Sequence, residues 1–150
     1  MGLYDGYDVT SSGMNAQRTR INVVSANIAN SQTTHTAEGG PYKKQNVVFE
    51  EILMEAQKST ASNNNNSTLS QNPLSGVAVK SVIDSQNEPI MKYEPGHPDA
   101  NTDGYVAYPN INPVVEMIDL IEATRSYEAN VSAFTAHKDI DTKTLDILKA

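Results

Sequence analysis

The sequence predicts a mainly α-helical fold with a small β part, in which two long terminal helices pair as a coiled coil around a short, loop-rich β segment. Three observations predict this fold: apolar residues at heptad spacing near the N-terminus, a longer helical pattern at the C-terminus, and turn residues between them. We expect an N-terminal helix and polar motif in residues 1–34, a middle segment in 35–112 and a C-terminal helix in 113–150. The first and last of these segments should form one core unit.

The N-terminal helix is expected over residues 3–30. Its apolar residues recur at a spacing of seven, at Tyr7, Met14, Ile21 and Ile28, and Leu3 and Val24 fall beside them. Gly13 is a weak point in this stripe, and the intervening positions Thr10 and Gln17 are polar. An isolated coiled coil built on this pattern would be weak, so the stripe needs a partner helix.

The middle segment changes character several times. Residues 31–46 are polar and contain Gly and Pro, which predicts a loop, whereas 46–57 fit either a short strand or a helix. Residues 58–75 are of low complexity and Asn-rich, so they offer too little apolar burial to offset their ordering and are expected to be a flexible loop. Alternating residues and turns in 76–108 predict two or three short antiparallel strands, limited in extent by prolines.

The C-terminal helix has the clearest signals. Asn112 can cap it and Pro113 can occupy its first position, and neither Gly nor Pro occurs from Val114 to Ala150. Such a helix would be about 55 Å long. Its apolar stripe is expected at Leu120, Thr124, Tyr127, Val131, Phe134, Leu145 and Leu148, flanked by Met117, Ile121 and Ile147.

Composition limits the classes of function. Hydrophobic residues make up 38% of the chain, which predicts a thin core and favours assembly with other chains over a monomeric helical hairpin. The net charge of −7 argues against nucleic acid as a partner, and the absence of Cys excludes disulfides and thiolate sites. The N-terminal residues lack the pattern of a secretory signal, and no apolar run is long enough for a membrane span, so direct lipid anchoring is not expected.

One short run has the spacing of a metal-binding loop. Asp99, Asn101, Asp103 and Gly104 match positions 1, 3, 5 and 6 of an EF-hand. Position 12 is Asn110 instead of the bidentate Glu that the loop needs, so a polar turn is the preferred interpretation. The three histidines show no ligand spacing either, and we expect no catalytic residues, metal, cofactor or small-molecule substrate.

Residues 93–113 are rich in proline and tyrosine, and two interpretations remain open. The segment is either a proline-stiffened loop or a docking surface beside the start of the long helix. In the second case Tyr93, Tyr105 and Tyr108 would suit an interface.

Four stretches of the sequence resemble one family. "ANIANSQT" (26–33) is similar to the N-terminal signature of bacterial flagellar axial proteins, with Ile28 as a departure from it, and "MIDLIEATRSYEANVSAF" (117–134) is similar to their C-terminal helix. "YEPGHPDANTDGYVAYPNINPVVEM" (93–117) and "VVFEEIL" (47–53) resemble the proximal-rod members of that family. Together they cover both ends and about half of the chain.

The resemblance implies a structural role and no catalysis. Rod proteins of this family are exported without a cleaved signal peptide by the flagellar export apparatus. They polymerise into the basal-body rod, which crosses the periplasm, links the membrane (MS) ring to the hook and transmits torque. The implied partners are copies of the chain itself, other rod proteins, the MS ring and the export apparatus.

The resemblance also implies roles for particular residues. The stripes would pair the two helices, Ala26 and Ala29 would allow neighbouring helices to approach closely, and Asn27, Asn30 and Thr33 would satisfy backbone groups at the helix end. The full set expected to mediate assembly is Tyr7, Met14, Ile21, Val24, Ala26, Asn27, Ile28, Ala29, Asn30, Thr33, Met117, Leu120, Ile121, Arg125, Tyr127, Asn130, Val131 and Phe134.

Two other classes of function compete with the rod subunit. A helical-hairpin adaptor or export chaperone would keep both stripes but remain a small, defined oligomer. A hydrolase using Asp99, Asp103 and His97 would need a concave pocket that holds these groups with perturbed pKa values.

Overall fold

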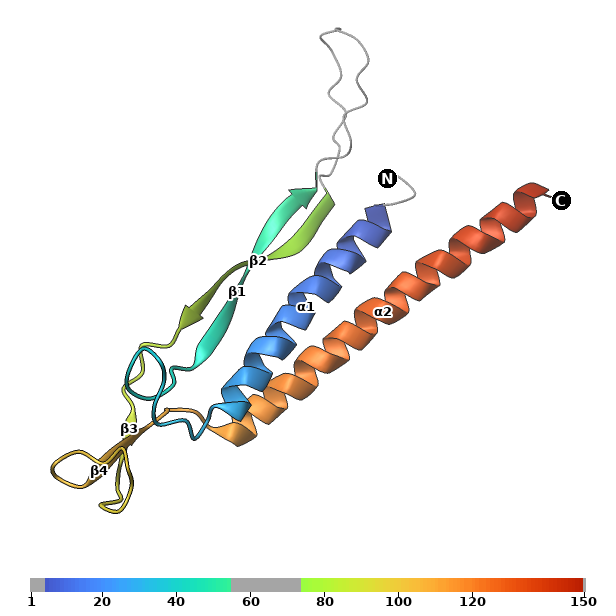
Figure 1. Ribbon diagram of the computed structural model, residues 1–150. Coiled ribbons are helices and arrows are strands. Elements are labelled where there is room, and N and C mark those ends of the chain that lie inside the picture. Colours follow the sequence, from blue (N-terminus) through green and yellow to red (C-terminus); the bar gives the residue numbers. More distant parts are fainter. Residues whose placement is uncertain (1–4, 55–73, 150) are drawn as a thin grey trace, which may run out of the picture.

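The fold is a pair of antiparallel helices with two small β-hairpins, as the sequence predicted (Figure 1). The computed structural model describes residues 5–54 and 74–149. Its elements, in chain order, are α1 (Asp5–Ala29), β1 (Gln45–Met54), β2 (Leu74–Asp84), β3 (Ile90–Tyr93), β4 (Tyr105–Tyr108) and α2 (Pro113–Lys149). The helix α1 lies between α2 and the β1–β2 hairpin, and the β3–β4 hairpin lies at the end where α1 stops and α2 begins.

The start of α2 follows the capping prediction. Pro113 is the first helical residue, and the Asn112 side-chain oxygen accepts a hydrogen bond from the backbone N–H of Val114 at 3.0 Å. The Asn112 carbonyl also accepts the N–H of Glu116 at 3.1 Å. The side-chain bond satisfies one of the backbone donors that a helix leaves unpaired at its N-terminus, and the carbonyl bond is the first hydrogen bond within the helix.

The middle segment forms two separate antiparallel sheets. β1 pairs with β2 from Gln45 opposite Asp84 to Met54 opposite Leu74, with an irregularity between Val48 and Phe49. The sequence left residues 46–57 undecided between a strand and a helix, and this pairing shows that the described part of them is a strand. It also corrects the C-terminal limit of the expected loop over 58–75, because β2 already begins at residue 74. The rest of that loop lies outside the described residues. β3 and β4 complete the predicted short strands.

The twist of the long hairpin brings a different strand against α1 at each end. Near the C-terminus of α1, β1 lies beside the helix, where Gln45 bonds to Asn27. Near the N-terminus of α1, β2 lies beside it, where the Val77 N–H donates to the Ser12 hydroxyl at 3.2 Å. Figure 1 shows the two strands crossing between these points. This right-handed twist is intrinsic to β-ribbons.

The two helices approach each other through small and polar residues. A Cβ added at Gly6 would lie 3.0 Å from the His137 ring, and one added at Gly13 would lie 3.1 Å from the Asn130 side chain. Fourteen residues further along α1, about four turns, Asn27 bonds to Glu116. Each step of seven or fourteen residues along α1 is therefore matched by an equal step backwards along α2, which is the spacing of an antiparallel coiled coil.

The predicted stripe of large apolar residues is consequently rotated from the centre of this interface to its edge. Met14, Ile21 and Ile28 are half-buried, and Tyr7 packs edge-on against Phe134 with ring centroids 5.0 Å apart. Gly13, the weak point of the apolar stripe, has a use in the helix pair, because its missing side chain gives Asn130 the room that it occupies. Large side chains at the closest positions would force the helices apart, so they flank the contact instead.

The corresponding stripe on α2 divides in two. Leu120, Tyr127 and Phe134 are half-buried toward α1, whereas other members of the predicted stripe and its flanks face outward: Met117, Ile121, Thr124, Val131, Leu145, Ile147 and Leu148. These outward positions point away from α1 or lie in the part of α2 that continues past α1. The helix thus has more apolar surface than one partner helix covers.

The core is thin, as the composition indicated. Among the described residues the buried apolar side chains are Ala16, Val23, Val24, Val106, Ile111 and Ala123. Large apolar side chains remain exposed on α2 and on both hairpins. Within 5–54 and 74–149, no helix combines the length and apolar character that a membrane span requires.

We predict that Gly13→Val destabilises the folded chain. The added atoms would meet Asn130, and overpacking of this kind costs about 1–3 kcal/mol in the free energy of unfolding. Urea unfolding followed by circular dichroism measures the change. Asn15→Val, at an exposed position on the same helix, is the matched control and should change stability by less than about 0.5 kcal/mol. Equal effects of the two variants would contradict the close approach at Gly13.

Candidate interaction site

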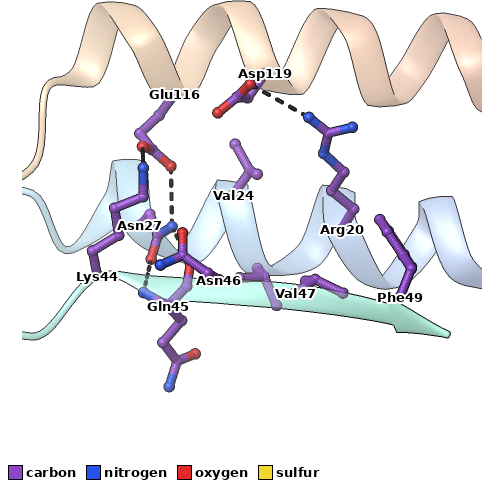
Figure 2. Close-up of a pocket in the computed structure, with 11 residues that line it drawn as sticks. Arg20, Val24, Asn27, Lys44, Gln45, Asn46, Val47, Phe49, Glu116 and Asp119 are labelled. Atoms are coloured by element: carbon purple, nitrogen blue, oxygen red, sulfur yellow. Dashed lines mark hydrogen bonds and ion pairs between the residues drawn. The ribbon is translucent and has the colours of Figure 1, made fainter. Parts of the chain in front are cut away.

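A polar cavity of about 190 Å³ lies where α1, α2 and β1 meet (Figure 2). α1 contributes Arg20, Val23, Val24 and Asn27, α2 contributes Glu116 and Asp119, and β1 with the preceding residue contributes Lys44, Gln45, Asn46, Val47 and Phe49. The cavity is therefore lined by both helices and by the first strand of the β1–β2 hairpin. The side chains around it decide how those parts are held together.

Asn27 is the centre of this site. Its side-chain NH₂ donates to the Gln45 carbonyl at 2.9 Å and to a Glu116 carboxylate oxygen at 3.0 Å. Its side-chain oxygen accepts the Gln45 N–H at 2.9 Å and the Tyr42 hydroxyl at 3.2 Å. An asparagine amide offers two donor hydrogens and two acceptor lone pairs, so all four are used. Toward Gln45 the amide takes the place of a neighbouring strand.

Glu116 is buried together with Asn27, and its charge is compensated. The Lys44 ammonium lies 2.6 Å from one carboxylate oxygen, while Asn27 binds the other. The Glu116 side chain is 2% exposed and the Lys44 side chain 25% exposed. Removing one partner of such a pair leaves a charge without compensation in a place that water barely reaches, which is costly. Figure 2 shows this cluster joining α2, α1 and the start of β1.

Tyr42 completes the cluster on its outer side. Partial burial raises the pKa of the Tyr42 hydroxyl, and the negative charges of Asp84 and Glu116 raise it further. The hydroxyl therefore stays protonated at neutral pH and can donate its hydrogen bond to Asn27.

The opposite rim of the cavity carries a second, weaker contact between the helices. Arg20 lies 3.4 Å from Asp119 and 3.9 Å from Glu122. All three side chains are substantially exposed, so this contact contributes little to stability by itself. The cavity is thus lined by charges of both signs that are already paired with each other, an arrangement that joins elements rather than activating a nucleophile.

The structure revises the role expected for Asn27. The sequence suggested that Asn27, Asn30 and Thr33 satisfy backbone groups at the end of their own helix. Asn30 does donate to the Ala26 carbonyl at 2.9 Å, whereas the Thr33 hydroxyl donates to a side chain, that of Asn30, at 3.1 Å. Asn27 does not, because it points across the helix pair and bonds to Gln45 and Glu116.

The remaining residues expected to mediate assembly are not brought together at one place. Val24 lines the cavity, and Asn130 faces Gly13. The exposed members of the set lie on the outer surfaces of the helices, at Ala29, Met117, Ile121, Arg125 and Val131. The members on these outer surfaces are available to another chain.

Sequence reasoning missed Glu116, Lys44 and Arg20. In the sequence each of them looks like an ordinary charged residue exposed to solvent, and no local pattern predicts that Glu116 is buried. One signal was available: Asn27 and Glu116 both fall in heptad register with the small or polar residues Gly13 and Asn130, so a polar stripe could have been followed in place of the apolar one.

The acidic loop forms the polar turn that was expected. The Asn101 side-chain oxygen accepts the N–H groups of Asp103 and Tyr105, and Gly104 has a φ of +80°. Asp99 accepts a hydrogen bond from Thr34. The residues suggested for a hydrolase, His97, Asp99 and Asp103, line neither the polar cavity between α1, α2 and β1 nor a smaller cavity of about 120 Å³ near Pro89.

The three tyrosines suggested for an interface differ in exposure. Tyr93 and Tyr105 are exposed and pack edge to face with ring centroids 5.3 Å apart. Tyr108 is half-buried, donates to Glu94 at 2.9 Å and lies under the Lys92 ammonium. The hydrogen bond to Glu94 is the main cause that raises the pKa of Tyr108.

We predict that Asn27→Leu strongly destabilises the fold although it preserves side-chain size. It leaves the Gln45 backbone groups and one Glu116 carboxylate oxygen without the hydrogen bonds that Asn27 makes, and buried unpaired groups cost about 1–3 kcal/mol each. Asn15→Leu, at an exposed asparagine of the same helix, is the control. Urea unfolding curves of both variants give the comparison, and a small loss for Asn27→Leu would show that its four bonds contribute little.

Comparison with known proteins accounts for both ends of the chain. Residues 8–34 match the family model described as "Flagella basal body rod protein", and residues 102–147 match "Flagellar basal body rod FlgEFG protein C-terminal". The first match covers most of α1 and the polar motif over residues 26–33, in which α1 ends. The second covers β4 and most of α2.

Curated relatives extend the match over nearly the whole chain. The flagellar basal-body rod protein FlgC of Borreliella burgdorferi is 37% identical over 99% of both chains. FlgC of Bacillus subtilis is 37% identical over 99% of this chain and 100% of the relative, and FlgC of Salmonella typhimurium is 35% identical over 98% of both. The chain belongs to the FlgC family of flagellar basal-body rod proteins.

Proposed function

We propose that this chain is a structural subunit of the flagellar basal-body rod, where it helps to link the membrane ring to the hook and to transmit torque. The observation that carries the proposal is the identity of 35–37% with FlgC proteins of three bacteria over almost the full length of each. The geometry is consistent with it, because the charged side chains that line the cavity pair with each other and join α1, α2 and β1.

The exposed surface supports a subunit that works in an assembly. α2 leaves apolar side chains such as Val114, Met117 and Ile118 more than half exposed, and β3 is exposed at all four residues. Contiguous exposed apolar surface on a small protein generally marks an interaction site. We propose that copies of this chain and other rod proteins cover this surface.

We further propose how the chain is arranged in the rod. Residues 1–34 and 113–150 act as one packing unit, and 35–112 face outward from it. The rod subunit reaches its place across the periplasm through the flagellar export apparatus, without a cleaved signal peptide, and the MS ring is a further partner. The exposed aromatic face of the β3–β4 hairpin, with Tyr93 and Tyr105, offers one surface for such contacts.

An adaptor or export chaperone remains the competing function. Such a protein would also contain a helical hairpin with exposed apolar faces, but the curated relatives named above are rod proteins. The two functions differ in where the chain ends up. A rod subunit is a component of the finished basal body, whereas an export chaperone stays with the cytoplasmic pool.

We predict that deleting the gene in its own bacterium abolishes filament formation and swimming, because a missing rod segment leaves no base for the hook. A plasmid copy should restore both, and mass spectrometry of purified hook–basal bodies should detect the chain. A deletion strain with normal filaments would contradict the proposal. Restoration of swimming with the chain absent from purified basal bodies would favour the adaptor.

A further inference from the structure

The outward side of α2 carries a second apolar face, opposite to α1. Val114, Met117, Ile118 and Ile121 have the spacing i, i+3, i+4, i+7, which places them on one side of a helix. Their exposed fractions are 64%, 51%, 54% and 54%, while Ala123, in register with Glu116 on the α1 side, is fully buried. We call these four residues the aliphatic stripe. Its spacing fits another helix as the covering element.

The outward side of α1, opposite to α2, has complementary character. Asn22, Ser25 and Ala29 are exposed there and have helical spacing; we call these three residues the small-residue face, and the exposed Arg18 continues their line. Because Asn27 lies level with Glu116 in the helix pair, Asn22 lies level with Ile121 and Ala29 with Val114. The two faces therefore sit at the same height on opposite sides of one subunit.

Charged residues continue both faces along the same line. Arg18 forms no ion pair or side-chain hydrogen bond among the described residues. It lies level with Arg125, which is on the outward side of α2. Arg125 is flanked by the exposed Glu122 and Glu128; Glu122 already lies 3.9 Å from Arg20 of its own subunit, so Glu128, one turn along α2, is the carboxylate that Arg18 of a second copy would meet. The β1–β2 hairpin lies along a different side of α1 and leaves the small-residue face exposed.

We propose that the aliphatic stripe of one copy packs against the small-residue face of a second copy, side by side and at the same height. Large side chains then fit against small ones, as in close helix packing. Because the two surfaces differ, the contact is heterologous and repeats from copy to copy, which produces a ring or a helical array instead of a closed dimer. This inference rests on the proposed function and specifies the contact between neighbouring subunits.

Thiol crosslinking tests the contact, because the chain has no native Cys. Asn22→Cys with Ile121→Cys places one thiol on each face in the same variant. Within one subunit these positions lie on opposite sides of two helices, about 20 Å across, so a short bis-maleimide can join them only between copies. At high concentration of the full-length chain we expect a ladder of dimers, trimers and larger species. Each single variant can give dimers at most.

The matched control is Asn22→Cys with Ser132→Cys, which is also exposed on the outer side of α2. Residue 132 lies eleven positions beyond 121, about 16 Å along the helix axis. This control should give no ladder. A ladder of equal strength would show random collision and would overturn the proposal, as would a test pair that gives no ladder.

Swimming of the same strains separates this inference from the proposed function. Cells that swim with the Asn22→Cys, Ile121→Cys chain as their only copy, but show no crosslinked species in purified basal bodies, would keep the rod function and lose this interface. Failure of the chain to appear in basal bodies at all would instead remove the proposed function.

Discussion

The fold depends on one buried amide. Asn27 uses all four of its hydrogen-bonding positions, on Gln45, Tyr42 and Glu116, and so fixes α1 to β1 and α2 at a single point. A thin core buries little apolar surface, and apolar contacts do not fix orientation. Hydrogen bonds with defined geometry must therefore set the positions of α1, α2 and β1 relative to one another. The salt bridge from Lys44 binds the other oxygen of the Glu116 carboxylate in the same cluster.

This constraint explains why the helix pair is built from small residues. Once Asn27 and Glu116 set the register, the heptad step brings Gly13 to Asn130 and Gly6 to His137, where an added Cβ would crowd the facing side chain. The large aliphatic residues are displaced to the flanks and to the outer side of α2. The exposed apolar surface is therefore a consequence of the same packing that holds the monomer together, and assembly with other chains is the natural way to cover it.

Much of this architecture follows from the sequence, and the exceptions have physical causes. The cap at Asn112, the limits of both helices and the short strands after residue 74 depend on local signals. Local signals do not reveal which face of α1 meets α2. Apolar periodicity marks where large residues recur, whereas the helices approach most closely at small residues. Glu116 was missed for a related reason: its burial is set by Lys44 and Asn27, which are distant in sequence.

The central claim is that Asn27 and Glu116 act as one unit. A double-mutant cycle with Asn27→Ala, Glu116→Ala and the double variant, measured by urea unfolding, tests it most directly. The account predicts that the double variant loses less stability than the two single losses added together, by more than about 1 kcal/mol, because each single change leaves the buried atom that faced the removed side chain without its hydrogen bond. Additive losses would contradict the claim and would mean that each residue stabilises the fold independently.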